Sequence, residues 1–222
     1  MKKAFTLIEL LVVIAIIAVL AAILFPVFAQ AKRAAKTTTT IANARQLGSA
    51  FALYGGEADD LLPLSTEGWD GEGKEGGWVY YDEFGLDAAG RFDVAKGSLY
   101  PYVKNRDIYK APLDPDADQA KESFAFNGCL VVPPFQYGIN PSLSPTSLAE
   151  PAGTMLLGEE ASDGANGKRG TNDGFFHPQF DHFAFRHAGG AALLFVDGHA
   201  KVTKANLQRA VDGGDKPCWP NP

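Results

Sequence analysis

The sequence is poor in cysteine and in positive charge, and each shortage excludes a class of protein. Only two cysteines, Cys129 and Cys218, occur in 222 residues, and neither lies near the N-terminus, which excludes a lipid-anchored lipoprotein. Acidic residues outnumber basic ones by 26 to 20, and no basic stripe with interleaved aromatic residues is visible. We therefore expect no general nucleic-acid binding, although a local basic patch of a DNA-uptake protein would escape this test.

Motifs that carry chemistry are also missing. No serine lies in a nucleophile elbow, and no Gly-rich loop is placed to hold a phosphate. The histidines could form a metal cluster with Asp181, but a spacing of five residues places successive histidines on opposite faces of a strand. The four histidines are His177, His182, His187 and His199. We therefore predict no enzyme, and no catalytic, cofactor-binding or metal-ligating residues.

Polar side chains are absent from a long stretch near the N-terminus. Twenty consecutive residues from Leu10 to Ala29 carry none, and as a helix they would span about 30 Å, the thickness of a bilayer core. Lys2 and Lys3 precede the run, so the N-terminal flank should stay cytoplasmic. Glu9 breaks the pattern, because a carboxylate at this depth costs a few kcal/mol unless it finds a cation.

Two ordinary kinds of segment compete for this stretch. A secretory signal peptide would use the two lysines as its basic region, and Ala29-Gln30-Ala31 imitates a cleavage site. Its apolar region would be too long, however, and would contain Glu9. A simple membrane anchor explains the length of the run but leaves Glu9 unexplained.

The string Lys-Lys-Ala-Phe-Thr-Leu-Ile-Glu-Leu-Leu, which begins at Lys2, resembles the cleavage and methylation signal of type IV pilins and type II secretion pseudopilins. The resemblance implies that a prepilin peptidase cuts between Ala4 and Phe5 and methylates the new amine of Phe5. Ala4 stands where the family usually has Gly, and it keeps the small size that the position needs. Glu9 would then neutralise the Phe5 amine of a neighbouring subunit, which makes both residues assembly determinants.

This resemblance divides the chain into a leader at 1–4, a transmembrane or filament-core helix at 5–29, an amphipathic second half of the helix at 30–56, and a head at 57–222. The second half carries an apolar stripe at helical spacing, and Gly55-Gly56 should end the helix. The stripe consists of Ile41, Ala44, Leu47, Phe51 and Tyr54. The remaining chain is long enough for one head domain with its own core.

The segment 57–77 is acidic and rich in glycine. Some pseudopilins bind calcium in loops of the head, so a calcium site here is conceivable, but the spacing of the acids matches no EF-hand loop. We expect a solvated, flexible loop. The acids are Asp59, Asp60, Glu67, Asp70, Glu72 and Glu75.

Segments of the head resemble, in order, a large pseudopilin-like family named for a C-terminal His, nine residues, then Asp-Gly. The motif here is His187, then Asp197-Gly198. Ala111 stands where relatives commonly have Cys, so the bond made by that Cys cannot form in this chain. An extracytoplasmic head would allow a disulfide between Cys129 and Cys218. The other matching segments are 97–105, 107–112, 123–128 and 153–159.

The motif itself favours a structural role. Ala191 to Val196 is an apolar run typical of a buried strand, and Asp-Gly favours a type I′ hairpin turn. His187 and Asp197 would then lie at opposite ends of that strand, up to about 30 Å apart. They should not form an acid–base pair, and His187 should pack or hydrogen-bond at the start of the strand.

We therefore predict an α+β fold in which a long N-terminal helix packs, with its second half, on an antiparallel sheet built mainly from the C-terminal half. The predicted function is a non-catalytic subunit of a type II secretion pseudopilus or type IV pilus-like filament. The expected partners are prepilin peptidase, other pilin or pseudopilin subunits and an inner-membrane assembly platform. The alternative is a membrane-tethered extracytoplasmic binding module that does not polymerise. Either would be a single-pass protein of the inner membrane, and the filament would be periplasmic or on the surface.

Overall fold

The computed structural model describes residues 6–85, 89–132, 138–162, 169–177 and 181–204. The chain divides into two compact units, Met1–Ala35 and Lys36–Pro222, and each is described by itself. The predicted processing residues Ala4 and Phe5 lie outside the described residues, as does Cys218.

The helix α1 runs from Leu7 to Glu57, so it ends at the predicted glycine pair. Pro26 lies inside the helix without ending it. In the second unit the apolar stripe of α1 faces the core of the head, as its spacing predicts: Ala44 and Leu47 are fully buried. The stripe is therefore what fixes this part of the helix to the head.

The head follows α1 as many short elements joined by turns. Its strands are β1 (Ser65–Glu67), β2 (Tyr81–Glu83), β3 (Arg91–Phe92), β4 (Phe124–Asn127), β5 (Gly138–Asn140), β6 (Met155–Ala161), β7 (Phe175–Phe176), β8 (His182–Phe183), β9 (Gly190–Phe195) and β10 (Ala200–Lys204). Its short helices are α2 (Gly68–Gly71), η1 (Val94–Lys96), α3 (Tyr100–Val103), η2 (Arg106–Tyr109), α4 (Ala117–Ala120), η3 (Gly128–Leu130) and η4 (Pro145–Ser147).

Within the described residues, the main sheet has the strand order β10-β9-β6-β4-β7, with β8 pairing to β6. The α+β prediction is confirmed, and the sheet is built from the C-terminal half of the chain. One detail differs: β4 and β7 pair in parallel, so the sheet is mixed and not purely antiparallel. Two smaller sheets pair β1 with β5 and β2 with β3.

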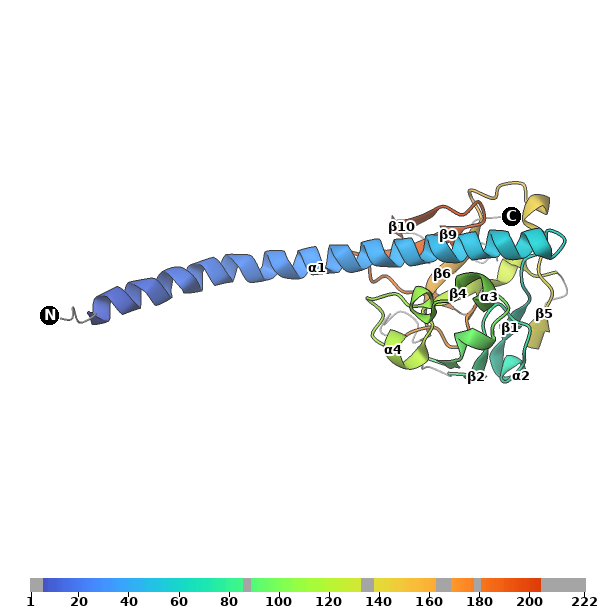
Figure 1. The fold of residues 1–222 in the computed structure, drawn as a ribbon, viewed down its shortest axis with the longest axis horizontal. Helices are drawn as coiled ribbons and strands as arrows, with labels where there is room; N and C mark the ends of the chain where they lie inside the picture. Colours follow the sequence, from blue (N-terminus) through green and yellow to red (C-terminus); the bar gives the residue numbers. More distant parts are fainter. Residues whose placement is uncertain (1–5, 86–88, 133–137, 163–168, 178–180, 205–222) are drawn as a thin grey trace. The chain divides into compact units, whose positions relative to one another are not determined.

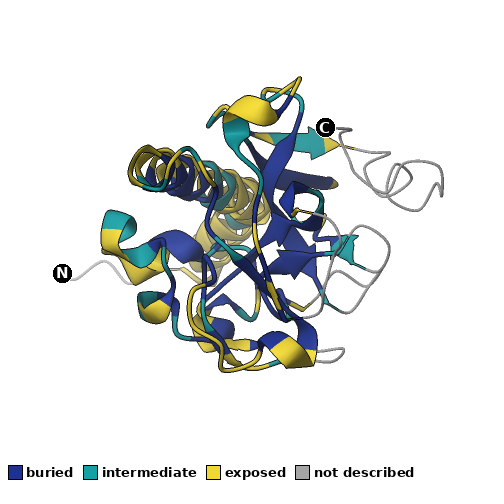
Figure 2. Ribbon diagram, turned by 90° about the vertical axis from the view of Figure 1, so that its right-hand side faces the viewer, coloured by how far each residue is buried: buried dark blue, intermediate teal, exposed yellow. Residues whose placement is uncertain are grey.

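The main sheet is covered on both faces. Figure 1 shows β4, β6 and β9 alongside the 36–57 part of α1, and Phe124, Phe126 and Leu194 belong to the core on that side. Alternate residues of the same strands, such as Leu193 and Phe195, join a second apolar cluster. All residues of β6 and β9 are therefore buried, as the dark ribbon in Figure 2 shows.

The acidic segment 57–77 is not the solvated loop that its composition suggests. It contains β1 and α2, and Glu67 at the end of β1 is buried. Pairing with β5 and a hydrogen bond of 2.8 Å from the Gly68 amide to Asp173 Oδ2 hold this stretch against the core. Composition alone could not show that some of these acids face inward.

Candidate functional site

The start of α1 is closed by a reciprocal pair of side chains. The backbone amide and the hydroxyl of Thr6 both donate to Glu9 Oε2, at 2.9 Å and 2.7 Å, and the Glu9 amide donates to Thr6 Oγ1 at 3.3 Å. This is the capping-box arrangement, which satisfies amides that a helix start leaves without partners. Glu9 therefore has a role within its own chain.

Beyond this cap, the helix surface is apolar on all sides. The large apolar side chains from Leu7 to Phe28 are each between 46% and 77% exposed. The helix is long and apolar enough to cross a membrane. A surface of this kind is stable only against lipid or against similar helices, since water would leave it without any favourable contact.

Comparison with known protein families bears on this segment. The family described as the prokaryotic N-terminal methylation motif matches residues 1–25. The chain carries a type IV pilin-like prepilin signal. No curated protein and no solved structure is a match.

The prepilin-type signal covers the residues whose pattern pointed to it. Thr6 and Glu9 lie inside the matched range, and so do the predicted cut between Ala4 and Phe5 and most of the apolar run. The signal supports membrane anchoring by a single pass and processing by a prepilin peptidase. The His-x9-Asp-Gly motif of the head lies outside that range and depends on its own geometry.

His187 is buried where the head meets α1. Its Nδ1 lies 2.9 Å from Thr37 Oγ1 of the helix, and its Nε2 is hydrogen-bonded to Glu159 Oε2 of β6. Both side chains of the His187–Glu159 pair are at most 1% exposed. His187 therefore links the helix to the central strand, as a structural role requires.

Glu159 also interacts with an arginine and with a backbone amide. Arg186 Nη1 lies 3.9 Å from its second oxygen, and Arg186 Nη2 lies 3.3 Å from Asp114 Oδ1. The Ala192 amide also donates to Glu159 Oε2, at 3.4 Å. A buried carboxylate is tolerated only with such partners, so this network fixes β6, β9 and the preceding loop together.

The two ends of the motif carry different turns from the one predicted. The type I′ turn lies at Ala188-Gly189, whose φ values are 51° and 81°, between the paired residues His187 and Gly190. At the other end, Phe195 pairs with His199 across three loop residues, of which only Gly198 has positive φ. The prediction of a type I′ turn at Asp197-Gly198 is wrong, because this pairing leaves three loop residues and not two.

The motif residues are not brought together. The six residues of β9 separate His187 from Asp197, a span of about 20 Å. Asp197 instead lies 2.6 Å from His199 Nδ1, and the His199 ring stacks on Phe195. His187 and Asp197 are therefore too far apart to act as an acid–base pair.

Three further candidates weighed from the sequence fall in or near the head. Within the described ranges, no group of three or more His, Cys, Asp or Glu residues could hold a metal ion. Calcium binding in the segment 57–77, conceivable from the sequence but not expected, is not tested by the structure. Cys129 takes part in a disulfide bond, and its predicted partner Cys218 lies outside the described residues, so the pairing stays a prediction too.

A second group of buried acids was missed by sequence reasoning. Burial raises the pKa of Glu67 to about 9 and that of Asp173 to about 7, and it raises the pKa values of Glu160 and Asp181 as well. The neighbouring carboxylates Asp173 and Asp181 add to the shift of Glu67 and of Glu160. These acids come from four separate segments, so no local spacing could reveal them.

Proposed function

We propose that this chain is a non-catalytic structural subunit of a type II secretion pseudopilus or a type IV pilus-like filament. It waits in the inner membrane with its head outside the cytoplasm, is cut between Ala4 and Phe5 and methylated at Phe5, and is then moved by an assembly platform into a filament. The observation that carries the proposal is the Glu9 carboxylate at the start of an exposed apolar helix, four residues after the amine that the signal would create.

The charge of Glu9 explains why assembly is favoured. Its hydrogen bonds from Thr6 support the carboxylate but do not neutralise it, and an ionised group costs a few kcal/mol within a bilayer. Both bonds go to Oε2, so Oε1 can accept a hydrogen bond from the Phe5 ammonium of a second copy. Each added subunit brings one amine and one carboxylate, so the same pairing repeats along a filament.

The maturation step is tested by mass spectrometry of the protein purified from membranes. The mature chain should begin at Phe5 and carry one added methyl group. A chain that begins at Lys32, after Ala29-Gln30-Ala31, would show that the segment is a secretory signal peptide and would end the filament proposal.

The assembly step is tested with Glu9→Gln and Glu9→Ala, expressed beside the unaltered chain. A glutamine can still accept the hydrogen bonds of Thr6, because Gln serves at this position of a capping box. Loss of sheared filaments in Glu9→Gln, with a normal membrane pool, therefore isolates the charge. Normal filaments from both variants would contradict the proposal and leave the tethered binding module, which needs the apolar helix but not the charge.

A further inference from the structure

A groove of about 490 Å³ lies at the end of α1, within the head unit, and it is lined by small and apolar residues with two carboxylates. Four of the five helix residues that line it are glycine or alanine. We call it the acidic groove; it is lined by Gly48, Phe51, Ala52, Gly55, Gly56, Asp60, Leu62, Pro145, Leu156, Val196, Asp197 and Gly198.

Two aspartates line the acidic groove, and among the described residues His199, beside Asp197, is the only ion-pair partner that either of them has. Hydrogen bonds from Ser144 and Thr146 hold the pKa of Asp60 below its usual range. Desolvation raises the pKa of Asp197, but hydrogen bonds from His199 outweigh it, so this pKa is also below its usual range. The last turn of α1 has no basic residue against the partial negative charge of its carbonyl end, and no Lys or Arg is among the described lining residues.

Another face of the head presents positive charge. Lys104 lies in the turn after α3 and Arg106 is the first residue of η2, and both are exposed. Lys104 is in none of the ion pairs formed by the described residues, and Arg106 has only an exposed contact of 3.5 Å with Asp93. The neighbouring Asp107 already pairs with Lys110, at 2.6 Å. We call residues 104–106 the basic turn.

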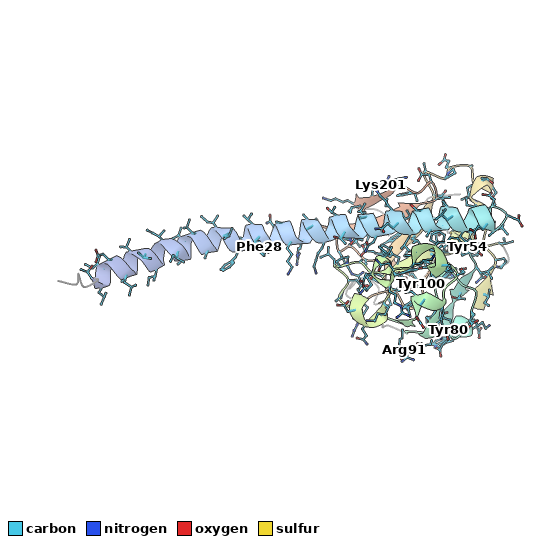
Figure 3. All side chains as sticks on the ribbon, viewed as in Figure 1. Phe28, Tyr54, Tyr80, Arg91, Tyr100 and Lys201 are labelled. Carbon is cyan, nitrogen blue, oxygen red and sulfur yellow. The ribbon has the colours of Figure 1, made fainter. Side chains whose placement is uncertain are left out.

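The groove and the basic turn lie on different faces of the head. The basic turn is continuous with α3, where Tyr102 packs against Tyr54 of the helix at 5.9 Å between ring centroids. Tyr54 points about 60° around the helix from Phe51 and about 160° from Ala52, and both of these residues line the groove. Figure 3 shows Tyr100 of α3, the helix before the basic turn, on one side of α1, and Lys201 of β10, the strand after the groove residues Asp197 and Gly198, on the other.

We propose that the acidic groove receives the basic turn of a second copy of this chain, as the contact between heads of adjacent subunits. The inference rests on the proposed filament, in which all helices enter one membrane in the same direction. In parallel subunits, two different faces of neighbouring heads meet, so the groove of one head can face the basic turn of the next. Such a heterologous contact propagates and does not close, as a filament needs, whereas groove against groove would bring like charges together.

Cysteine cross-linking of the full-length chain in membranes tests the contact directly. Ala52→Cys is placed in the groove and Lys104→Cys in the turn, in two separately tagged copies that are expressed together. A bifunctional maleimide should join the two copies to each other, while each variant expressed alone should give no dimer above the unaltered chain. Glu75→Cys in place of Lys104→Cys is the control for random collision, since Glu75 is exposed elsewhere on the head.

Charge reversal gives the second readout. Lys104→Glu with Arg106→Glu should reduce sheared filaments about tenfold or more, because it sets like charges together. Lys74→Glu, an exposed cation elsewhere, should not. Adding Asp60→Asn and Asp197→Asn to the reversed turn should partly restore filaments, which a folding defect would not allow.

The outcomes separate this contact from the filament proposal. Filaments that depend on Glu9 but not on the basic turn, together with no cross-link between Ala52→Cys and Lys104→Cys, would overturn the head contact alone. A dimer of Ala52→Cys with itself would also overturn it, since that is a two-fold contact. Normal filament yields from both Glu9→Gln and Glu9→Ala would overturn the filament proposal itself.

Discussion

Two glutamates in apolar surroundings, Glu9 and Glu159, are held in opposite ways. Glu159 is fully buried, and its partners are a histidine, an arginine and a backbone amide of its own chain. Glu9 is exposed on an apolar helix, and its hydrogen bonds come only from Thr6, with no cation among the described residues near it. The buried carboxylate Glu159 thus has its partners within its own chain, whereas Glu9 on the N-terminal helix has no cation partner among the described residues.

The largest effect on stability should follow from breaking the head's internal pairing. Glu159→Ala leaves His187 buried without its carboxylate and Arg186 with Asp114 alone, a loss of about 3–5 kcal/mol. The melting temperature of the full chain in detergent should fall by about 10 °C. Arg91→Ala is the control, since its ion pairs with Asp82 and Glu83 are exposed and should matter by less than about 1 kcal/mol.

Glu9→Gln, in contrast, should leave the same melting temperature unchanged. Both substitutions remove a carboxylate from an apolar setting, but only one removes a partner on which the head depends. Equal melting temperatures for Glu159→Ala and the unaltered chain would mean that the buried network adds nothing to folding.

The next effect is a dependence of head stability on pH. Burial raises the pKa of Glu67 to about 9 and of Asp173 to about 7, while the same acids titrate near 4 when unfolded. Between these values the folded state binds more protons, so the free energy of unfolding should fall as pH rises from about 5 to about 9. Burial lowers the pKa of His177, which opposes the trend through a single group.

Denaturant unfolding at several pH values measures this slope. Glu67→Gln removes one protonation site and should flatten the profile above pH 7, whereas Glu75→Gln, at an exposed site, should leave it as it was. A head that becomes more stable from pH 5 to pH 9 would contradict the burial of these acids.

A smaller effect is expected at the end of β9. Gly198 has φ of 87°, and a Cβ there would meet nothing within 4 Å, so Gly198→Val costs only backbone strain, about 1–3 kcal/mol. Gly198→Asn should cost less, because Asn tolerates this conformation. Gly56→Ala is the matched control, since the site is equally open but its φ is not positive, and it should be neutral or stabilising. Equal melting temperatures for Gly198→Val and Gly198→Asn would show that the turn does not need its glycine.

Regular local patterns were sufficient to predict α1 and β9. The stripe from Ile41 to Tyr54 and the apolar run from Ala191 each repeat at the spacing of their element, so burial follows from the sequence. The turn type at Asp197-Gly198 was predicted wrongly, because an Asp-Gly pair indicates a turn but the strand register decides how many residues it contains.

The buried network could not be predicted in the same way. His187 meets Glu159 across 28 residues and Thr37 across 150, and no pattern within a window of sequence links such positions. The cap at the start of α1 is different, since Thr6 and Glu9 have the Thr-x-x-Glu spacing of a capping box. The sequence pattern therefore predicts the cap as well as assembly, and Glu9 serves the first role within its own chain.

The smallest effect should come from Thr6, and it tests whether the two roles of Glu9 are separable. Thr6→Ala removes the hydroxyl that exchanges hydrogen bonds with Glu9, which should cost about 0.5–2 kcal/mol of local helix stability and fray the first turn. The charge of Glu9 is kept, so filaments should still form, with a yield close to that of the unaltered chain. Hydrogen exchange of the amides of residues 7–10 in detergent measures the fraying, and sheared filaments measure assembly. If Thr6→Ala abolishes filaments as completely as Glu9→Ala, the cap and the charge act as one device, and the contrast between Glu159, paired within the head, and Glu9 would need to include the cap.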